Sequence, residues 1–457
     1  MKGSDNTDRE KRKMGDQFFD SQFSRRNFLK IFGAAAVSGG TLLGSTPASS
    51  SETARSKLKE LVFQSNSEEL YWRMLRAEFA LKDELIHMNT GTLSSTSNYV
   101  LKKVKDHFQV LAEDPYPTAF LHPYNLAEAH VKAASFLGTD EDEIVITGCT
   151  TEGMSFVAMG LDLGPGDEVL TTMHEHSGGL SCWEVLRDRR GITLTEMPFQ
   201  ASYDSKQEII DLFESAITPN TKVMSFCHIN YTSGLRLPVK ELCTLARDNN
   251  IISVIDGAHA IGMLNLDLHD IGCDFYACSP QKWLCAPPGV GVLYAKKDKQ
   301  DLLWPTVTEA YGSKFQTAFE LRGQRSVPVL VCLKDAMDFQ DAIIGGKDAI
   351  EERIMSLSAY AKARLMQIPG VHLACATNPE LSSGLTAFYI KDQWVKQTAI
   401  SAMLMEKYNI LIRTVAYKND SSESINRKVL RMSTHIYNNY DQIDLFARAI
   451  EENLDLI

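Results

Sequence analysis

The sequence lacks several features that mark specialised classes of protein. Its 457 residues carry 47 Lys and Arg against 58 Asp and Glu, a net charge of −11, so nucleic acid is not an expected partner. The nine cysteines are odd in number and show no metal-binding spacing, which excludes a complete disulfide framework and predicts no metal site. No internal repeat is present, and 44% hydrophobic residues indicate two or three packed globular domains.

The first 48 residues read as an export signal. A basic opening precedes Ser24-Arg25-Arg26-Asn27-Phe28-Leu29-Lys30, and a weakly apolar run at 31–44 follows. This run of about fourteen residues is shorter than the ~20 that span a membrane, so no permanent membrane anchor is expected. The S-R-R-x-F-L-K pattern resembles a twin-arginine signal, which implies the twin-arginine export machinery as a partner and a periplasmic or otherwise exported location. A general secretory signal or the basic flank of a surface helix is the alternative.

The rest of the chain predicts a large α/β domain followed by a smaller α+β domain. Seven apolar runs separated by helical stretches indicate a mostly parallel sheet buried on both faces, at 143–147, 168–172, 192–197, 223–229, 251–255, 275–279 and 290–295. A helical stretch, short strands and a closing helix follow. We expect helical structure over 49–104, with an exposed amphipathic helix at 57–85 that packs on the small domain or on a partner subunit. The large domain is expected at 105–335 and the small domain at 336–457.

Three motifs lie at the carboxyl ends of predicted strands, where such sheets bind ligands. Lys282 follows the run at 275–279, and a desolvated amine there can form a Schiff base, although a solvated loop lysine is the alternative. Asp256 ends the preceding strand and can pair with the ring nitrogen of pyridoxal phosphate, or cap a helix. Thr150 and Thr151 begin a helix and form either an anion site or a simple N-cap.

Together these segments resemble the class V aminotransferases, enzymes of pyridoxal-phosphate fold type I, and most of all their isopenicillin N epimerase and cysteine desulfurase-like branch. The resemblance begins at Met88-Asn89-Thr90-Gly91 and continues to the C-terminus. It implies pyridoxal 5'-phosphate as cofactor, a Schiff base at Lys282, and Asp256 facing the pyridine nitrogen. It also implies phosphate binding by Thr150, Thr151 and Ser279, ring stacking by His176, contacts near the phenolic oxygen by Asn230 and His259, and substrate binding by Arg431 and Asn89.

Three departures from the family pattern narrow the prediction. Gln281 stands where the family usually has a histidine before the lysine. Gln324 replaces the threonine that reaches the phosphate of the neighbouring subunit, so both glutamines are candidate cofactor contacts. Cysteine desulfurases need a nucleophilic cysteine in the loop after Arg413, and residues 414–419 contain none, which disfavours persulfide chemistry.

We therefore expect an exported enzyme that acts on the amino group or Cα of a small amino acid or peptide-like metabolite, similar to isopenicillin N epimerase. An aminotransferase or C–S lyase, possibly one that tailors a secreted peptide or siderophore, is the alternative, because the shared core serves epimerisation, transamination and elimination alike. A non-catalytic small-molecule-binding relative is the contrasting class, but such a protein is expected to have lost Lys282 or Asp256. The resemblance further implies a homodimer with its sites at the subunit interface.

Overall fold

The computed structural model describes residues 56–61, 65, 67–115, 126–390, 396–417 and 427–454. The predicted export signal lies outside these ranges. All nine cysteines lie inside them, and none forms a disulfide. Within the same ranges, no helix combines the length and apolar character needed to cross a membrane.

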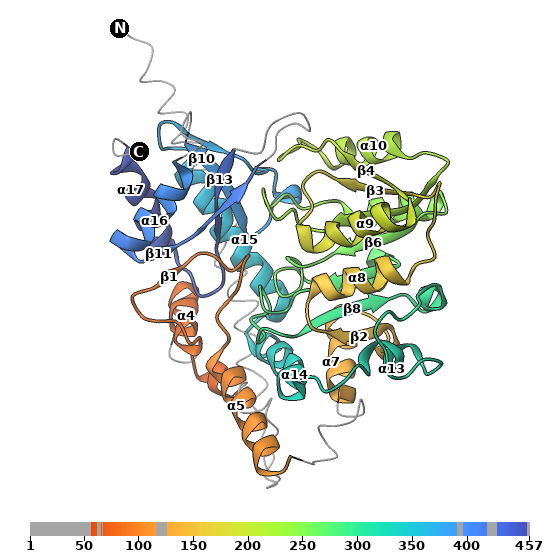
Figure 1. Ribbon diagram of the computed structural model, residues 1–457. Coiled ribbons are helices and arrows are strands. Elements are labelled where there is room, and N and C mark those ends of the chain that lie inside the picture. Colours follow the sequence, from red (N-terminus) through yellow and green to blue (C-terminus); the bar gives the residue numbers. More distant parts are fainter. Residues whose placement is uncertain are drawn as a thin grey trace.

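A seven-stranded sheet forms the centre of the larger part of the molecule (Figure 1). Its order is β2-β8-β7-β6-β5-β3-β4, with β8 antiparallel to both neighbours and the other pairs parallel. The strands are β2 (Ile144–Thr147), β3 (Glu168–Thr172), β4 (Thr193–Met197), β5 (Thr221–Cys227), β6 (Ile252–Asp256), β7 (Phe275–Cys278) and β8 (Gly291–Ala295). The prediction of a mostly parallel seven-stranded sheet beside a smaller C-terminal domain is confirmed.

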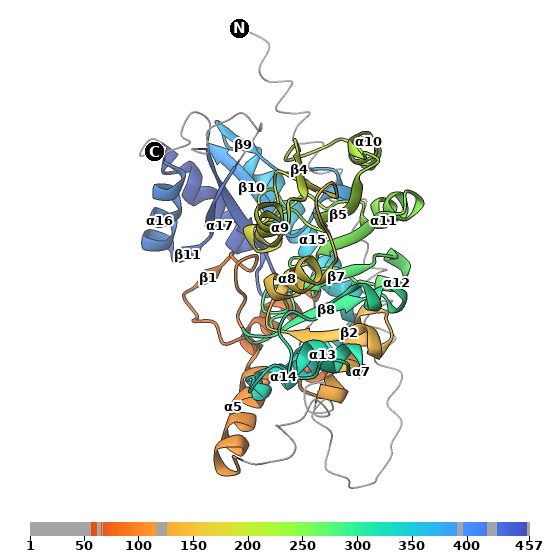
Figure 2. The same ribbon diagram turned by 45° about the vertical axis from the view of Figure 1, so that its right-hand side comes forward.

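The two faces of this sheet belong to different hydrophobic cores, which explains why central strands such as β7 and β8 are apolar, whereas the edge strand β4 is partly polar and only partly buried. Val169 and Val254 pack with α8, α9 and α13 on one face, while Leu170 and Ile255 pack with α7, α10, α11 and α14 on the other (Figures 1 and 2). The helices of this part are α7 (Ala127–Leu137), α8 (Thr150–Gly160), α9 (Ser177–Arg190), α10 (Lys206–Ala216), α11 (Val239–Asp248), α12 (Leu268–Ile271), α13 (Phe315–Glu320) and α14 (Val327–Ala342).

The smaller part is built on an antiparallel sheet of order β12-β13-β10-β9. Its strands are β9 (Val371–Leu373), β10 (Leu385–Ile390), β12 (Arg413–Ala416) and β13 (Lys428–Ser433). Leu357, Leu404 and Phe446 pack around this sheet with Phe388. They come from α15 (Gly346–Leu365), α16 (Gln397–Tyr408) and α17 (Tyr440–Glu451).

The N-terminal segment differs from the single exposed helix predicted at 57–85, which was wrong in extent and in exposure. Helix α4 covers only Glu68–Leu75, and its Tyr71, Trp72 and Leu75 are buried. The chain then extends, because β1 (Ile86–His87) pairs in parallel with β11 (Ile410–Leu411) of the small part. This pairing draws the following loop across the face between the two parts, towards the strand ends of the large sheet.

Two long helices cross the domain boundaries predicted from sequence. The boundary at 104/105 falls inside α5 (Asn98–Glu113), and the boundary at 335/336 falls inside α14. These helices pack against each other, and α14 also packs against α7, so the contacts of each helix continue across the predicted cut. The division into domains stays a prediction.

Candidate active site

Lys282 lies in the turn after β7, where its amine meets His259. Lys282 Nζ is 3.3 Å from His259 Nε2, and His259 Nδ1 accepts a hydrogen bond of 3.2 Å from the indole N–H of Trp283. Because Nδ1 is an acceptor, the proton of the neutral ring resides on Nε2, and burial keeps the pKa of His259 well below its usual value. Burial also lowers the pKa of Lys282 to about 8. His259 Nε2–H can therefore donate to a neutral lysine amine.

Asp256 ends β6, the neighbouring strand, and is only 5% exposed. Its Oδ1 accepts a hydrogen bond of 2.9 Å from the N–H of Ala258. Burial raises the pKa of Asp256, while the charge of Lys282, the Ala258 N–H and His176 lower it. A Cβ on Gly179 would lie 2.8 Å from Asp256 Oδ2, so glycine at this position allows α9 to begin close to the carboxylate. A cationic ring nitrogen beside Asp256 would form a charge-assisted hydrogen bond.

The N-terminus of α8 supplies hydroxyl and N–H groups for an anion. Thr150 Oγ1 is 2.6 Å from Ser279 Oγ, and the Thr150 N–H donates to the same serine oxygen at 3.2 Å. Thr151 is exposed beside Gly178, where any Cβ would collide with its hydroxyl. The N-terminus of a helix carries free N–H groups and the positive end of the helix dipole. The predicted phosphate residues are thus brought together.

His176 caps the N-terminus of α9 and faces Tyr231. Its Nδ1 accepts a hydrogen bond of 3.0 Å from the Gly178 N–H, and its ring centroid is 5.0 Å from that of Tyr231 in an edge-on arrangement. Burial and the charge of Lys282 lower the pKa of His176. The imidazole is therefore favoured in its neutral form, which suits the predicted stacking on a planar ring.

Arg431 enters the site from β13 of the small part. Its Nη1 donates to the Tyr231 carbonyl at 2.6 Å and its Nη2 to Thr92 Oγ1 at 3.2 Å. Its Nε is buried and has no hydrogen-bond partner within the described chain. Thr92 in turn donates to Asn89 Oδ1 at 2.8 Å, which brings both predicted substrate residues together. Burial and the charge of Arg413 lower the pKa of Arg431 to about 9, so an anionic ligand would stabilise this guanidinium.

Three predicted residues make other contacts or lie apart. The Asn230 carboxamide oxygen accepts from the N–H groups of Thr232 and Ser233 and so holds a turn. Gln281 accepts from the Ser94 N–H through its main chain, while its buried side-chain oxygen has no partner in the described ranges. Gln324 is exposed between α13 and α14, and its predicted contact is to a neighbouring subunit. The cofactor contacts of all three stay predictions.

Sequence reasoning did not assign three residues that shape the site. Trp283 fixes the His259 tautomer, Thr92 joins Arg431 to Asn89, and Tyr231 contacts both His176 and Arg431. Trp283 and Thr92 each lie within three residues of a motif that was recognised, which was the only signal they offered. Tyr231 likewise follows the predicted residue Asn230, but only the fold brings it to His176 and Arg431.

A cavity of ≈ 400 Å³ opens beside the site. Its lining includes His176 and Tyr231, together with Glu175, Glu184 and Arg413. Burial raises the pKa of Glu175 to about 8, so this carboxyl group is mostly neutral at pH 7. The cavity offers space for a substrate beyond the lysine and the deep arginine.

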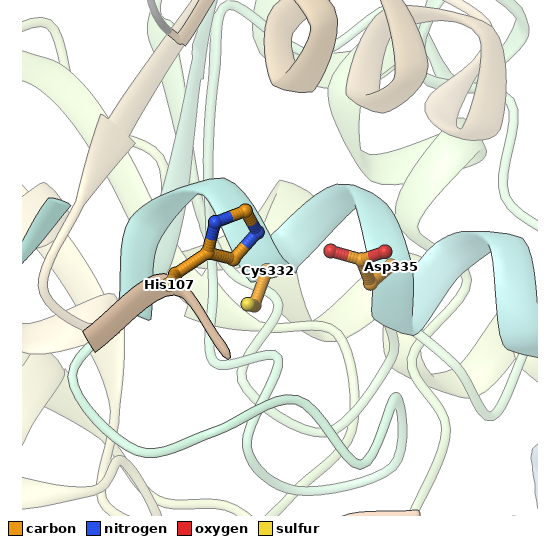
Figure 3. Close-up of side chains that lie close together, drawn as sticks. All are labelled: His107, Cys332 and Asp335. Atoms are coloured by element: carbon orange, nitrogen blue, oxygen red, sulfur yellow. The ribbon is translucent and has the colours of Figure 1, made fainter. Parts of the chain in front are cut away.

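The described residues contain two groups of potential metal ligands, one of Asp140, Glu143 and His269 and one between α5 and α14. His107, Cys332 and Asp335 have their ligand atoms within 4.8 Å of one another (Figure 3). Asp335 already accepts a hydrogen bond of 3.2 Å from the Tyr99 hydroxyl. Burial raises the pKa of both Cys332 and Asp335, which opposes the deprotonation that metal binding requires. We assign no metal to this cluster, and the expectation that the protein has no metal site stays a prediction.

The fold, the lysine and aspartate on neighbouring strand ends and the helix N-terminus together define a pyridoxal-phosphate-dependent enzyme of fold type I. The chain belongs to the aminotransferase class-V family, whose model matches residues 121–446. It is 30% identical to the isopenicillin N epimerase of Streptomyces clavuligerus, over 83% of this chain and 98% of that protein. It is 28% identical to a probable cysteine desulfurase of Halalkalibacterium halodurans, over 68% of this chain and 77% of that protein.

A solved structure shares the same fold. It is a C-DES mutant with glycine covalently linked to the PLP cofactor, and it aligns with a TM-score of 0.74 at 24% identity, over 82% of this chain and 99% of that one. The residues of the present site also fit pyridoxal phosphate. Gly178 and Gly179 leave space beside Thr151 and Asp256, and hydroxyl groups gather at the N-terminus of α8. Lys282 and Asp256 supply an amine and a carboxylate on neighbouring strand ends.

Proposed function

We propose that this chain is an exported pyridoxal-phosphate-dependent enzyme that acts at the Cα of an amino acid or peptide-like metabolite, in the manner of isopenicillin N epimerase. The observation that carries the proposal is the Lys282 amine, which burial favours in its neutral form and which lies 3.3 Å from His259 Nε2. A neutral lysine amine is both the nucleophile that binds the cofactor and a base of suitable strength. The similarity to the Streptomyces epimerase over nearly its whole length supports the same reading.

Some residues of the site bind the cofactor and the substrate, and Lys282 transfers a proton. Pyridoxal phosphate, when bound, supplies an electron sink that makes the Cα–H of an amino substrate more acidic. Thr150, Thr151 and Ser279 bind its phosphate, while Asp256 holds a proton on its ring nitrogen. Arg431 binds the substrate carboxylate through its guanidinium. Lys282 Nζ then takes the proton from Cα.

We propose epimerisation as the type of reaction at Cα. Persulfide transfer is disfavoured because residues 414–419 contain no cysteine, even though cysteine desulfurases are among the relatives. Epimerisation returns a proton to Cα, whereas an aminotransferase requires a keto acid as its second substrate. An aminotransferase or C–S lyase that tailors a secreted peptide or siderophore is the alternative, since C-DES itself is a cystine C-S lyase. Loss of activity without added keto acid would favour the aminotransferase.

We further propose a homodimer with Gln324 reaching the phosphate of the neighbouring subunit. Gln324 is exposed and lies between α13 and α14, which leaves it accessible to a second copy. The mature chain should sediment as two subunits, and Gln324→Ala should weaken the affinity for pyridoxal phosphate. A monomer of unchanged cofactor affinity would contradict this proposal.

The first test is the visible absorption of the mature chain from about Ser49, before and after borohydride reduction. We expect an absorption band that borohydride abolishes and that Lys282→Ala lacks. The control is Lys362→Met, because Lys362 is 4% exposed and, like Lys282, has a pKa lowered by burial, yet it binds Ser382 outside the site. A wild-type protein that stays colourless after reconstitution would overturn the proposal and favour a non-catalytic binding protein.

A further inference from the structure

Two arginines meet at one hydroxyl group without an acidic partner. Arg413 on β12 and Arg431 on β13 are register partners in antiparallel strands, and each donates to Thr92 Oγ1 at 3.2 Å. Like charges placed opposite each other on paired strands are destabilising. Within the described ranges, neither guanidinium forms an ion pair with an Asp or Glu side chain. Since the fold gains nothing from this repulsion, a bound anion is the natural partner.

The two guanidinium groups lie at different depths. Arg431 is 3% exposed and donates to the main chain of Tyr231, so it lies at the bottom of the site. Arg413 is exposed and lines the cavity together with His176 and Glu184, whereas Arg431 is not part of that lining. One small carboxylate bound at Arg431 would therefore leave the cavity side of Arg413 without a partner.

The charges of the cavity also favour an anionic ligand. Burial lowers the pKa of Lys282, and the charges of Arg431 and Arg413 lower it further, although Asp256 opposes them. Burial keeps Glu175 mostly neutral at pH 7, since its pKa is raised to about 8. Glu184 makes no ion pair with either arginine in the part of the chain that the structure describes. Arg413 is thus the one Lys or Arg side chain of the cavity lining, and within the described part of the chain no ion pair compensates its charge.

We propose that the substrate carries two acidic groups. Arg431 binds the carboxylate next to the reacting carbon, and Arg413 binds a second acidic group that reaches into the cavity. The substrate class is then an amino acid that carries a second acidic group at some distance from the reacting carbon. This inference rests on the proposed function for the identity of the first carboxylate.

The test compares glutarate with valerate, two unreactive five-carbon acids that differ by one carboxylate. Calorimetry on the reconstituted enzyme should show that glutarate binds about tenfold tighter or more, as expected for one charge-assisted contact. Arg413→Gln should remove this preference and leave valerate affinity within about twofold, while Arg413→Lys should restore part of it. The control is Arg247→Gln, because Arg247 is exposed on α11 and should change neither affinity.

Other results would overturn the proposal. Equal losses of glutarate and valerate in Arg413→Gln would show that both arginines bind one carboxylate. No preference for glutarate in the wild type would show that there is no second subsite. Without ligand, the Arg413→Gln protein should melt at the same temperature as the wild type or higher, because the substitution removes a repulsive pair of charges. A lower melting temperature would indicate that Arg413 has a structural role instead. An absent cofactor band would count against the proposed function alone, since glutarate binding remains measurable on the apoprotein.

Discussion

At the level of single residues, the reactivity of Lys282 depends on burial, which lowers its pKa, and on His259, which contacts its amine. Burial disfavours the ammonium form, and His259 presents an N–H because Trp283 occupies its other ring nitrogen. Thr92 likewise orients its neighbours, because its hydroxyl forms hydrogen bonds with Asn89, Arg413 and Arg431. Trp283 and Thr92, which were not predicted as site residues, therefore orient side chains that were.

The lowered pKa of Lys282 predicts how cofactor uptake depends on pH. The neutral amine is the nucleophile, and it predominates above a pKa of about 8 rather than above the ordinary 10.5. The rate of covalent pyridoxal phosphate uptake by the apoprotein should therefore rise with pH and level off above about pH 8. Stopped-flow absorbance measures this rate, with Lys282→Ala as the control. A rate that keeps rising towards pH 10 would contradict the assignment.

The nine thiols should differ sharply in reactivity. Cys149 is the N-cap of α8 and is partly exposed, whereas the other eight cysteines are buried. We expect one fast-reacting thiol when the native protein is titrated with a disulfide reagent, and none in Cys149→Ser. Bound pyridoxal phosphate should slow the reaction, because the predicted phosphate site begins at the next residue. Several fast thiols, or no protection, would count against this placement.

At the level of elements, the site is assembled by strand ends and by the close approach of loops to them. Asp256 and Lys282 follow adjacent strands of one sheet, while Arg431 lies on a strand of the other. Glycines allow these approaches. A Cβ on Gly257 would lie 1.9 Å from Tyr276 Cε1, and Tyr276 is fixed by a hydrogen bond of 2.7 Å to His228 Nδ1.

Gly257→Ala should therefore destabilise the protein by roughly 1–3 kcal/mol, the usual cost of overpacking a buried site. The matched control is Gly164→Ala, since no atom lies within 4 Å of a Cβ there and its stability should change by less than about 1 kcal/mol. Urea unfolding followed by tryptophan fluorescence gives both free energies. Equal changes in the free energy of unfolding for the two substitutions would show that the Tyr276 ring moves aside at little cost.

At the level of the whole molecule, the loop between β1 and α5 joins the two parts at the site. The Ser94 N–H donates to the carbonyl of Gln281, the residue before Lys282, at 3.0 Å. The same loop carries Asn89 and Thr92, which contact residues at the strand ends of the small part. A shift between the two parts would therefore move Arg431 relative to Lys282.

Export should depend on the arginine pair of the leader. Replacing Arg25 and Arg26 by lysine should leave the precursor in the cytoplasm, because the twin-arginine pathway recognises that pair. The wild-type protein should appear in the exported fraction with its cofactor already bound, since this pathway carries folded cargo. Cell fractionation with detection of the protein measures the outcome, and undiminished export of the lysine variant would indicate another route.

The sequence alone predicted the seven strands, because most of them are largely apolar runs bounded by helical or turn residues, although the edge strand β4 is partly polar. It also predicted Lys282, Asp256 and Thr150 as site residues, because each lies shortly after such a run. The tertiary structure decided what local patterns cannot encode. Tyr231 and Arg431 lie 200 positions apart, and only the packing of the two sheets brings them within 2.6 Å. The extent of α4, the tautomer of His259 and the meeting of Arg413 with Arg431 likewise depend on contacts between distant segments, because burial and charge act through space.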